Sequence, residues 1–330
     1  MDTTPLHGSL IVIDGHCDTA LDLVGNSFTD SSMAPRDFLA RCDRGHVDLP
    51  RLIEGGVTCQ VMALYTSDKM VAEANAHTKA LLAGVEGVLE RTDRFILMRK
   101  AADIRRAKAA GSVAALVSIE GGEAIGESLE ELRWFHGRGV RLMGLTWNRR
   151  NAIARGVGAE GAGGLTEFGG KVVAEMERLG MIVDVSHLSD EALEDVLAVA
   201  RRPLVASHSN SRVLCGHRRN LLDAQAERLA ATGGLIAVTF AGVFVDTDPA
   251  RVSLSRLVDH IEHLLSVVGP DHVGIGSDFD GYSEKYGVVL RGCHEMPRIT
   301  AALLERGHPE ESVRKVMGGN WLRVIEEVVG

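Results

Sequence analysis

Short apolar runs rich in β-branched residues recur along the chain, and longer segments with helical periodicity separate them. Continuous apolar runs of this length are typical of strands buried on both faces, as in a parallel sheet. We therefore expect strands at residues 10–14, 57–64, 113–119, 140–146, 181–186, 203–207, 235–240 and 273–277.

The segments between these runs carry apolar residues at the spacing of amphipathic helices. Helical patterns cover residues 70–91, 128–139, 165–180, 188–200 and 255–269, and several of them end at a glycine, as helices often do. Ser189 stands just before a turn that contains acidic residues, which predicts it as a helix N-cap.

Strands that alternate with helices in this way predict an α/β fold, a single (β/α)8 TIM barrel with extended βα loops, as one domain over residues 1–330. The alternative is a doubly wound open sheet. Against it, no G-x-G-x-x-G or G-x-x-x-x-G-K-[ST] motif directly follows any of the strands. The additional length lies after the first, seventh and eighth strands, at residues 19–48, 241–252 and 280–293.

The composition narrows the class of protein. Of the 330 residues, 45% are hydrophobic and 25% are charged, which is typical of a globular chain. A net charge of -9 without a long basic run argues against a nucleic-acid partner. The five cysteines are widely spaced and form no C-x-x-C, so we expect no disulfide framework. With no signal-peptide pattern and no long apolar stretch, we expect a cytoplasmic protein that has no membrane partner.

Ligand-type side chains follow five of the predicted strands. They are His16 and Asp18 after the first strand, Glu120 after the third, His187 after the fifth, His208 after the sixth and Asp278 after the eighth. In a barrel the carboxyl ends of the strands meet at one rim, where the chemistry of such folds is done. Any one of these residues could merely cap a turn, but ligands at five strand ends on one rim predict a metal site.

The donor set indicates how many metal ions are bound. Three imidazoles with two or three carboxylates are more than one catalytic zinc uses, since it takes about three protein ligands and a water. The set suits two ions bridged by a carboxylate, and Glu120 is the best candidate for the bridge. Imidazole with carboxylate favours Zn²⁺, with Mn²⁺, Co²⁺ or Fe²⁺ as replacements. A water acidified by both ions would be the nucleophile, and Asp278 could pass its proton to a leaving amine, so we expect a hydrolase.

The chain resembles the membrane (renal) dipeptidase family of dinuclear zinc peptidases, which have a barrel of the amidohydrolase type. The segments that carry the resemblance cover almost the whole chain: DGHCDT, SIEGGEAIG, LTWNRRN, VDVSHLS, SHSNSRVLCGHRRN, VGIGSDFDG and GGNWLRV. The resemblance implies a metalloprotease that hydrolyses dipeptides and often accepts a D-residue at the C-terminal position. It also allows for a homodimer, since barrels of this family often dimerise.

Carried over residue by residue, the resemblance implies where two zinc ions are held. His16, Asp18 and Glu120 are implied as ligands of one ion, and Glu120, His187 and His208 as ligands of the other. Glu120 is then both the bridge between the ions and a catalytic residue.

The resemblance also implies two residues that meet the substrate. Asp278 is implied as the acid/base that also contacts the free α-amine, and Arg219 as the residue that binds the α-carboxylate. A guanidinium suits that role because it can bind a carboxylate through two hydrogen bonds. Of the adjacent pair Arg218 and Arg219, we expect one to be a solvated loop residue.

Two positions depart from the pattern of the family. Where the family often has a histidine that helps to polarise the scissile carbonyl, this chain has Trp147. An indole N–H can only donate, so Trp147 could contact an oxyanion, or Asn148 or Arg150 could take that role. Losing one oxyanion donor typically costs about 10²–10³ in rate. The second departure is Phe244, near the place of a substrate-contacting tyrosine in relatives.

Two alternatives stay open. The same dinuclear centre could hydrolyse another small amide, such as an N-acyl amino acid or a lactam, and Trp147 and the unmatched loops 241–252 and 280–293 leave room for this. The other alternative is a catalytically inactive barrel that binds a metal or a small ligand. The presence of every expected metal ligand argues against it.

Overall fold

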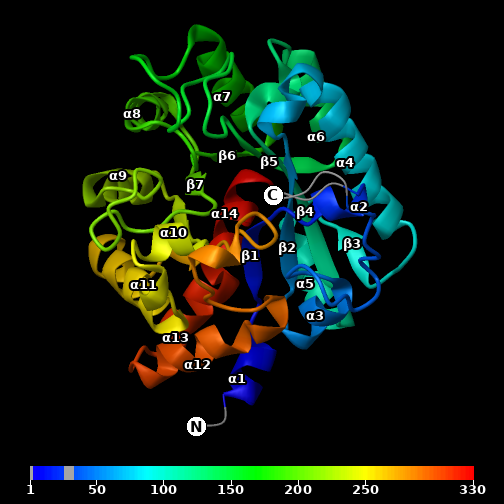
Figure 1. Cartoon of the computed structure of the whole chain (residues 1–330), viewed down its shortest axis with the longest axis vertical. Helices are drawn as coiled ribbons and strands as arrows, with labels where there is room; N and C mark the ends of the chain where they lie inside the picture. Colours follow the sequence, from blue (N-terminus) through cyan, green and yellow to red (C-terminus); the bar gives the residue numbers. More distant parts are fainter. Residues whose placement is uncertain (1–2, 26–32) are drawn as a thin grey trace.

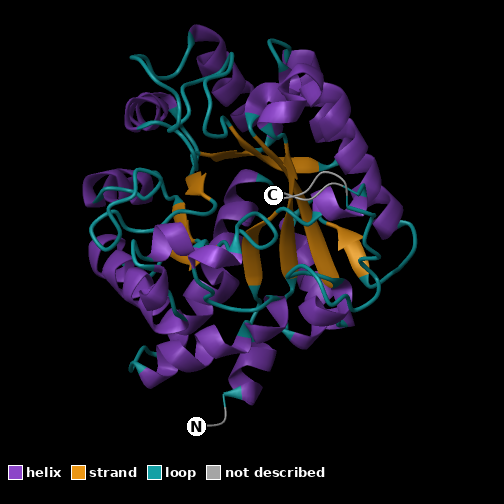
Figure 2. Ribbon diagram, in the orientation of Figure 1, coloured by secondary structure: helices purple, strands orange, loops and turns teal. Residues whose placement is uncertain are grey.

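A closed parallel barrel forms the centre of the computed structural model, which describes residues 3–25 and 33–330. Within these residues the strands lie in the order β2-β1-β9-β8-β7-β6-β5-β4-β3, and an additional pairing of β2 with β4 closes the ring. Figure 2 shows the strands at the centre with helices around them. The bounds are β1 Ile13–Cys17, β2 Cys59–Tyr65, β3 Phe95–Leu97, β4 Val113–Glu120, β5 Val140–Gly144, β6 Ile182–Asp184, β7 Leu204–Ala206, β8 Leu235–Val238 and β9 Val273–Ile275. The predicted (β/α)8 barrel is confirmed.

The predicted strands correspond to β1, β2 and β4 to β9, and β3 is the strand that sequence analysis did not find. β3 pairs with the first part of β4, from Phe95 opposite Val113 onward, whereas β5 pairs with β4 from Val117 onward. Thus β3 and β5 share one edge of β4, and β2 occupies the other edge. The first strand was predicted at residues 10–14, but it lies slightly later in the chain.

Helices surround the barrel on its outer face (Figure 1). The predicted helical segments contain α4, α6, α7, α8 and α11, and Ser189 caps α8 by accepting a hydrogen bond from Ala192 N at 3.2 Å, as expected. The bounds are α1 Thr4–Ser9, α2 Ala20–Leu23, α3 Leu49–Glu54, α4 Ala74–Leu89, α5 Ala101–Ala110, α6 Leu129–Arg138, α7 Glu167–Leu179, α8 Asp190–Val199, α9 Asp223–Ala231, α10 Gly242–Val245, α11 Leu254–Val268, α12 Pro297–Glu305, α13 Glu310–Arg314 and α14 Asn320–Val328.

The last helix, α14, covers the amino-terminal end of the barrel. Its Asn320 side chain donates to the carbonyl of Val273, at the start of β9, and the indole of Trp321 donates to the carbonyl of Ile275 at 2.9 Å. Trp321 is fully buried, and a Cβ at Gly15 would lie 2.2 Å from its ring, so β1 needs a glycine there. Because this end is closed, the carboxyl ends of the strands are left for a site.

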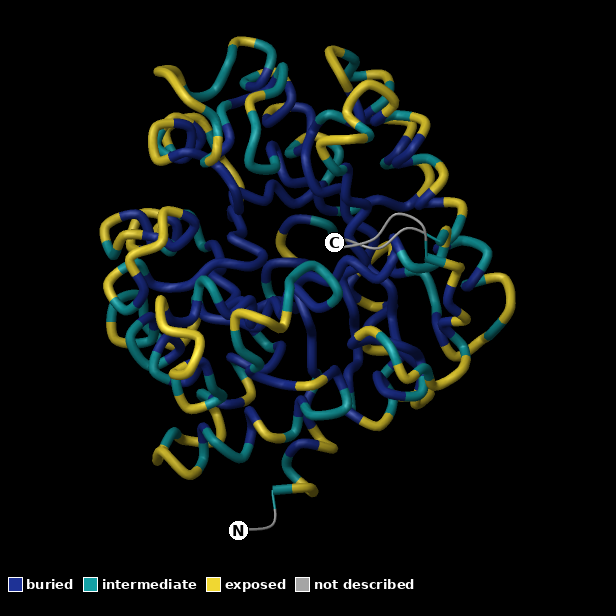
Figure 3. Tube along the Cα trace, in the orientation of Figure 1, coloured by how far each residue is buried: buried dark blue, intermediate teal, exposed yellow. Residues whose placement is uncertain are grey.

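Burial is greatest along the strands and the first residues that follow them, which Figure 3 draws in dark blue, whereas exposed residues lie on the outer helices and loops. Of the three long loops that were predicted, 241–252 contains α10, and 19–48 includes residues 26–32, which lie outside the described residues. None of the helices in the described ranges has the length and apolar character that a membrane span requires.

Candidate metal centre

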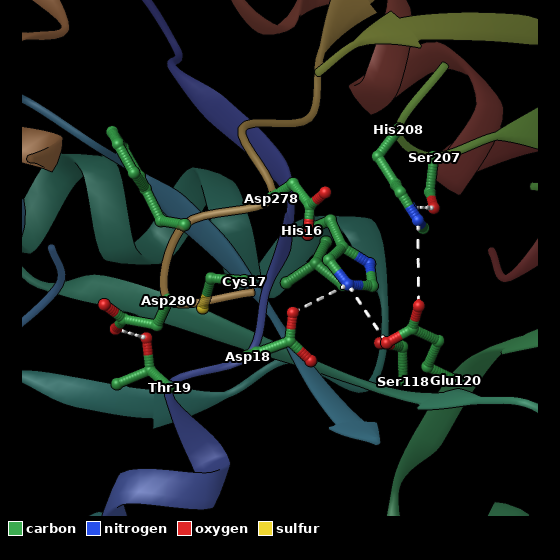
Figure 4. Close-up of polar contacts among 12 residues, drawn as sticks. His16, Cys17, Asp18, Thr19, Ser118, Glu120, Ser207, His208, Asp278 and Asp280 are labelled. Atoms are coloured by element: carbon green, nitrogen blue, oxygen red, sulfur yellow. Dashed lines mark hydrogen bonds and ion pairs between the residues drawn. The ribbon is translucent and has the colours of Figure 1, made fainter. Parts of the chain in front are cut away.

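The carboxyl-terminal rim of the barrel brings together every ligand predicted from the strand ends. Figure 4 shows His16, Asp18, Glu120 and His208 around one space, with Asp278 beside His16. His16 lies near the end of β1 and Glu120 ends β4, and the other ligands stand just beyond their strands. All of them are buried: His16, Asp18, Glu120, His187, His208 and Asp278.

Glu120 lies between two groups of ligands. Its Oε2 is 3.5 Å from His16 Nε2, and its Oε1 is 3.0 Å from His187 Nε2 and 3.7 Å from His208 Nε2. One carboxylate oxygen therefore faces each group. This is the arrangement that a bridging ligand requires.

The first group, at the end of β1, contains buried atoms without partners. His16 Nε2 is 3.5 Å from Asp18 Oδ2, yet both ring nitrogens of His16 and Oδ1 of Asp18 have no hydrogen-bond partner among the described residues. A Cβ at Gly281 would lie 2.1 Å from Asp18 Oδ2 and 2.5 Å from Asp278 Oδ1. The glycine thus makes room for two carboxylates. Buried polar groups are normally paired, so these atoms fit the ligands of a metal ion.

The second group consists of two imidazoles. The Nε2 atoms of His187 and His208 are 2.8 Å apart, and both lie near Glu120. On the other side of the rings, His187 Nδ1 is 2.8 Å from Asn148 Oδ1, and His208 Nδ1 is 2.7 Å from Ser207 Oγ. An amide oxygen can only accept, so it selects the Nδ1–H tautomer of His187 and leaves Nε2 as a free lone pair.

Backbone strain is concentrated at this rim. Among the non-glycine residues that the structure describes, positive φ angles occur only at His187 (68°), Asp278 (66°) and Asp280 (66°). Such conformations cost of order 1–3 kcal/mol each and persist where the surrounding structure imposes them. All three residues follow strands whose carboxyl ends form the site.

Burial controls the titration of the carboxylates. It raises the pKa of Asp278 to about 7, and the nearby charge of Glu120 adds to that rise. Burial also raises the pKa of Asp18 well above its usual value, again with a contribution from Glu120. For Glu120 itself burial acts upward too, but the charge and hydrogen bond of His16 outweigh it, so the pKa is lowered.

The imidazoles of the second group are kept neutral. Burial lowers the pKa of His187 to about 3, and the charge of Arg219 contributes to the shift. Burial lowers the pKa of His208 well below its usual value as well. Neutral imidazole is the form that ligates metals.

These donors fit divalent cations. Two sets of side chains each bring their ligand atoms within 4.8 Å of one another, one formed by His16, Glu120 and His208 and the other by His16, Asp18 and Asp278. Glu120 and Asp18 raise the pKa of His16 against the effect of burial, so this crowded, buried group of carboxylates favours positive charge, which metal ions would supply. The nitrogen and oxygen donors suit zinc and its neighbours in the first transition row.

Of the two adjacent arginines, Arg219 is buried and Arg218 is exposed. The Arg219 guanidinium donates to the carbonyl of His208 at 3.1 Å and to Ser209 Oγ at 3.3 Å, and its Nε has no partner among the described residues. It reaches this place from the loop that follows β7, and its charge acts on Asp278 and Glu120. The loop arginine predicted to be solvated is therefore Arg218.

Trp147 and the two residues that could take over its role differ in how close they lie to the ligands. Trp147 is half-buried, with its ring 5.3 Å from that of Tyr65 and 6.0 Å from that of His187. Asn148 uses its Oδ1 for the contact with His187. Arg150 is exposed and donates to the carbonyl of Ala162, on the outside of the site.

Phe244 lies beside the buried arginine. Its ring is 5.3 Å from the Arg219 guanidinium carbon and 4.7 Å from the ring of His217. Sequence analysis did not assign a role to Ser207, to Asp184 or to Tyr65, which all lie at the rim. Only the strand register brings them to the ligands, as Tyr65 pairs with Glu120 across β2 and β4.

Comparisons with known proteins agree with this geometry. Residues 2–329 match the family model described as membrane dipeptidase, peptidase family M19. "Dipeptidase tcpJ" from Claviceps purpurea (strain 20.1) is 35% identical over 297 residues, which are 86% of this chain and 69% of that protein.

Solved structures of similar proteins share the whole fold. A metallo peptidase from Rhodobacter sphaeroides, liganded with a phosphinate mimic of the dipeptide L-Ala-D-Ala, is 30% identical with a TM-score of 0.87, and the match covers 97% of this chain and 99% of that one. The probable dipeptidase PvdM from Pseudomonas aeruginosa is 25% identical with a TM-score of 0.88, covering 99% and 97%. The chain therefore belongs to the membrane dipeptidase family of metallopeptidases, peptidase family M19, whose members hydrolyse peptide bonds.

Proposed function

We propose that this chain is a dipeptidase that works with two zinc ions bridged by Glu120. The observation that carries the proposal is the position of the two Glu120 oxygens, one toward His16 and the other toward His187 and His208. The relative from Rhodobacter sphaeroides that binds a mimic of L-Ala-D-Ala supports dipeptides as substrates, with a D-residue accepted at the C-terminal position.

The ligands divide between the two ions. His16, Asp18 and Glu120 would hold one ion, and Glu120, His187 and His208 the other. The unpartnered nitrogens of His16 and the convergent Nε2 atoms of the other imidazoles support this division. When bound, the ions would supply Lewis acidity, which polarises a carbonyl and lowers the pKa of water.

Asp278 is the proposed proton carrier. Burial raises the pKa of its carboxyl, and its place beside His16 and Asp18 would let it take a proton from water and give it to the leaving amine. Its buried position beside His16 and Asp18 keeps this exchange away from bulk solvent. The same carboxylate, when ionised, would attract the free α-amine of a dipeptide.

Arg219 is the proposed ligand of the substrate's α-carboxylate. Its buried guanidinium keeps an unpaired Nε–H, so one donor is free for an anion. Binding of both the amine and the carboxylate would restrict the enzyme to substrates of about two residues. Trp147, between Tyr65 and His187, would form a wall beside the reacting group.

A second candidate function is hydrolysis of another small amide by the same centre. Trp147 favours it, because a larger indole with one N–H donor stands where relatives often have the imidazole that polarises the scissile carbonyl. Asn148 holds His187 through its Oδ1, so only its Nδ2 could donate to an oxyanion.

Hydrolysis of a panel of L-Xaa-D-Xaa and L-Xaa-L-Xaa dipeptides tests the proposal, before chelation, after chelation and with zinc restored. We expect cleavage that is lost with the metal and returns with zinc. A fully metallated protein that cleaves none of the dipeptides would favour the second candidate function.

The bridge can be tested by metal analysis of Glu120→Gln. A neutral amide offers one oxygen in place of two, so we expect a metal content well below two per chain. Unchanged metal content would remove Glu120 from the role of bridge.

The neighbouring arginines offer a matched pair of variants. Arg219→Ala should raise KM for dipeptides with a free carboxylate, while the exposed Arg218→Ala should leave it unchanged. Because the clamp needs a carboxylate, C-terminal amidation of the substrate should harm the wild type but not Arg219→Ala. Equal activity of the wild type on free and amidated dipeptides would contradict the role.

A further inference from the structure

At two places in the barrel, an aspartate of one strand is hydrogen-bonded to a serine that follows the neighbouring strand, and residues of the site come next in the chain. We call each of these Asp–Ser pairs a joint. Asp14 in β1 lies opposite Ile275 in β9, and Asp184 in β6 lies opposite Val205 in β7. Each aspartate accepts hydrogen bonds from the serine that stands two residues beyond its register partner: Ser277 for Asp14 and Ser207 for Asp184.

The two joints have the same pattern of hydrogen bonds. Asp14 Oδ1 accepts from Ser277 N at 2.7 Å and its Oδ2 accepts from Ser277 Oγ at 2.7 Å. Asp184 Oδ1 accepts from Ser207 N at 3.0 Å and its Oδ2 accepts from Ser207 Oγ at 2.5 Å. All these side chains are buried, so the bonds are shielded from water.

The joints differ in what the serine hydroxyl touches next. Ser277 Oγ lies 3.0 Å from the carbonyl oxygen of His16, which is a backbone acceptor. Ser207 Oγ lies 2.7 Å from Nδ1 of His208, which is a side-chain atom that can be either donor or acceptor. Only the second joint therefore ends on a group whose protonation pattern it can determine.

The direction of the hydrogen bonds follows from the chemistry of the carboxylate. An ionised carboxylate only accepts, so the single hydrogen of the Ser207 hydroxyl points to Asp184. The Ser207 oxygen must then accept from His208, which places the ring proton on Nδ1. Nε2 of His208 is left as a lone pair, and this is the atom that lies near Glu120 and His187.

We propose that Asp184 and Ser207 are positioning residues that fix the Nδ1–H tautomer of His208 and so prepare its Nε2 to bind metal. Histidine ligands of metals generally donate their other N–H to a partner of this kind, and loss of such a partner typically lowers metal affinity by about 10–100-fold. The inference rests on the proposed metal centre, since its importance lies in a ligand of that centre.

Substitution by asparagine distinguishes the two joints. In Asp184→Asn the amide oxygen would still accept from Ser186 N and Ser207 N, as Oδ1 of Asp184 does now. The amide nitrogen would then donate to the Ser207 hydroxyl. The hydrogen of that hydroxyl would turn toward His208 Nδ1 at 2.7 Å, which is a nearer acceptor than Ser186 Oγ at 3.4 Å. That arrangement selects the Nε2–H tautomer, which cannot bind metal until it rearranges.

Asp14→Asn is the matched control. The same reversal would turn the Ser277 hydroxyl toward the carbonyl of His16, which can accept it without any change of tautomer. Both variants replace one oxygen of a buried carboxylate by an amide nitrogen and keep the volume of the side chain. A difference between them therefore reports the tautomer of His208 and not the loss of a buried carboxylate.

The experiment has two readouts. In the metal-free protein, ¹⁵N–¹H NMR with labelled histidine gives the tautomer of His208, whose signals are assigned with His208→Gln. In competition with a chromophoric chelator, the zinc affinity of each variant is compared with that of the wild type. We expect the Nε2–H form and an affinity lower by at least about tenfold for Asp184→Asn, and values near those of the wild type for Asp14→Asn.

Ser207→Ala keeps the inference testable if Asp184→Asn does not fold. Without the hydroxyl, His208 loses the acceptor of its Nδ1–H, so we expect a mixture of tautomers and reduced zinc affinity. An Nδ1–H form with unchanged affinity in Asp184→Asn or Ser207→Ala would overturn the inference, and so would an equal loss in Asp14→Asn. A folded wild type that binds no zinc would overturn the proposed function instead, while the tautomer would still test the inference.

Discussion

Asp278 and Asp280 stand two residues apart after β9, and their pKa values are shifted in opposite directions. Both have a φ of 66°, Asp278 is buried, and only 6% of the Asp280 side chain is exposed. Yet burial raises the pKa of Asp278 to about 7, whereas for Asp280 the bonds and charges of His46 and Arg36 outweigh burial and lower the pKa.

The difference lies in the partners. Asp280 accepts from Arg36 at 2.9 Å, from Thr19 Oγ1 at 2.6 Å and from the backbone N–H of His46 at 2.6 Å. The Asp278 carboxylate receives, from the residues that the structure describes, a single long hydrogen bond from Thr239 at 3.4 Å. Asp280 is an anchor, ionised at neutral pH, for the segment that carries Arg36 and His46, and Asp278 is left able to gain and lose a proton. Hydrogen-bond partners and nearby charges, more than burial or backbone conformation, therefore decide whether a buried carboxylate has a raised or a lowered pKa.

The largest effect is expected for Asp278→Asn. Removal of the proton carrier should lower turnover of dipeptides by about 10²–10⁴, the usual worth of general acid–base catalysis, while metal content stays near two per chain. Steady-state kinetics with metal analysis checks both parts. Turnover near that of the wild type would contradict the role of Asp278.

Asp280→Asn should act on stability. Arg36 would lose one of its two buried carboxylate partners and keep Asp22, so we expect a loss of about 3 kcal/mol in the free energy of unfolding, at the low end for a broken buried pair. Urea denaturation measures it. Glu284→Gln is the control, because Glu284 also contacts His46 but is 56% exposed, and we expect a change within about 0.5 kcal/mol.

The pH dependence of stability should have opposite signs at the two positions. The folded pKa of Asp278 lies above its unfolded value, so the folded state binds more protons and this residue makes the metal-free protein less stable as the pH rises from about 4 to 7. Asp278→Asn should remove that decline. The pKa of Asp280 is depressed, so its contribution is present above about pH 4 and is lost as the pH falls further.

Melting temperatures of the wild type and both variants between pH 3 and 8, with chelator present, check these signs. The advantage of metal-free Asp278→Asn over the wild type should grow up to about pH 7. The deficit of Asp280→Asn should shrink only in acid. A deficit of Asp280→Asn that is independent of pH would show that its charge is not what stabilises the fold.

The smallest effect is expected for Thr19→Val. The hydroxyl of Thr19 donates a charge-assisted hydrogen bond to Asp280, and Val fills the same volume, so we expect a loss of about 1.5 kcal/mol by urea denaturation. Thr19→Ser keeps the hydroxyl and should recover most of it. If both variants lose the same amount, packing of the methyl group matters and the hydrogen bond does not.

Much of this site could be predicted from the sequence because barrel geometry converts position along a strand into position in space. A histidine or carboxylate at the carboxyl end of a strand must lie at the rim, so the positions of His16, Glu120 and His208 follow from the sequence once a barrel is expected. The short strand β3 could not be found in this way. Its three residues, Phe95–Leu97, are too few to show a periodicity.

The partners of the ligands could not be predicted, because they depend on which residues face each other across strands. That Ser207 lies between Asp184 and His208 follows from the register of β6 and β7, and no local pattern contains it. Likewise, sequence analysis did not assign a role to Asp280. Its true partners, Arg36 and His46, lie more than 200 residues away in the chain.

The uneven lengths of the strands have a consequence for the motions of the barrel. β2 and β4 pair over seven consecutive residues, and β3 and β5 extend the sheet beyond β4, whereas β6, β7 and β9 have three residues each. Regions with long hydrogen-bonded ladders open least often, and short ones open more readily. Amide hydrogens should therefore exchange slowly around Glu120 and faster around His187 and His208. One half of the rim is therefore rigid, and local opening of the site is expected in the other half.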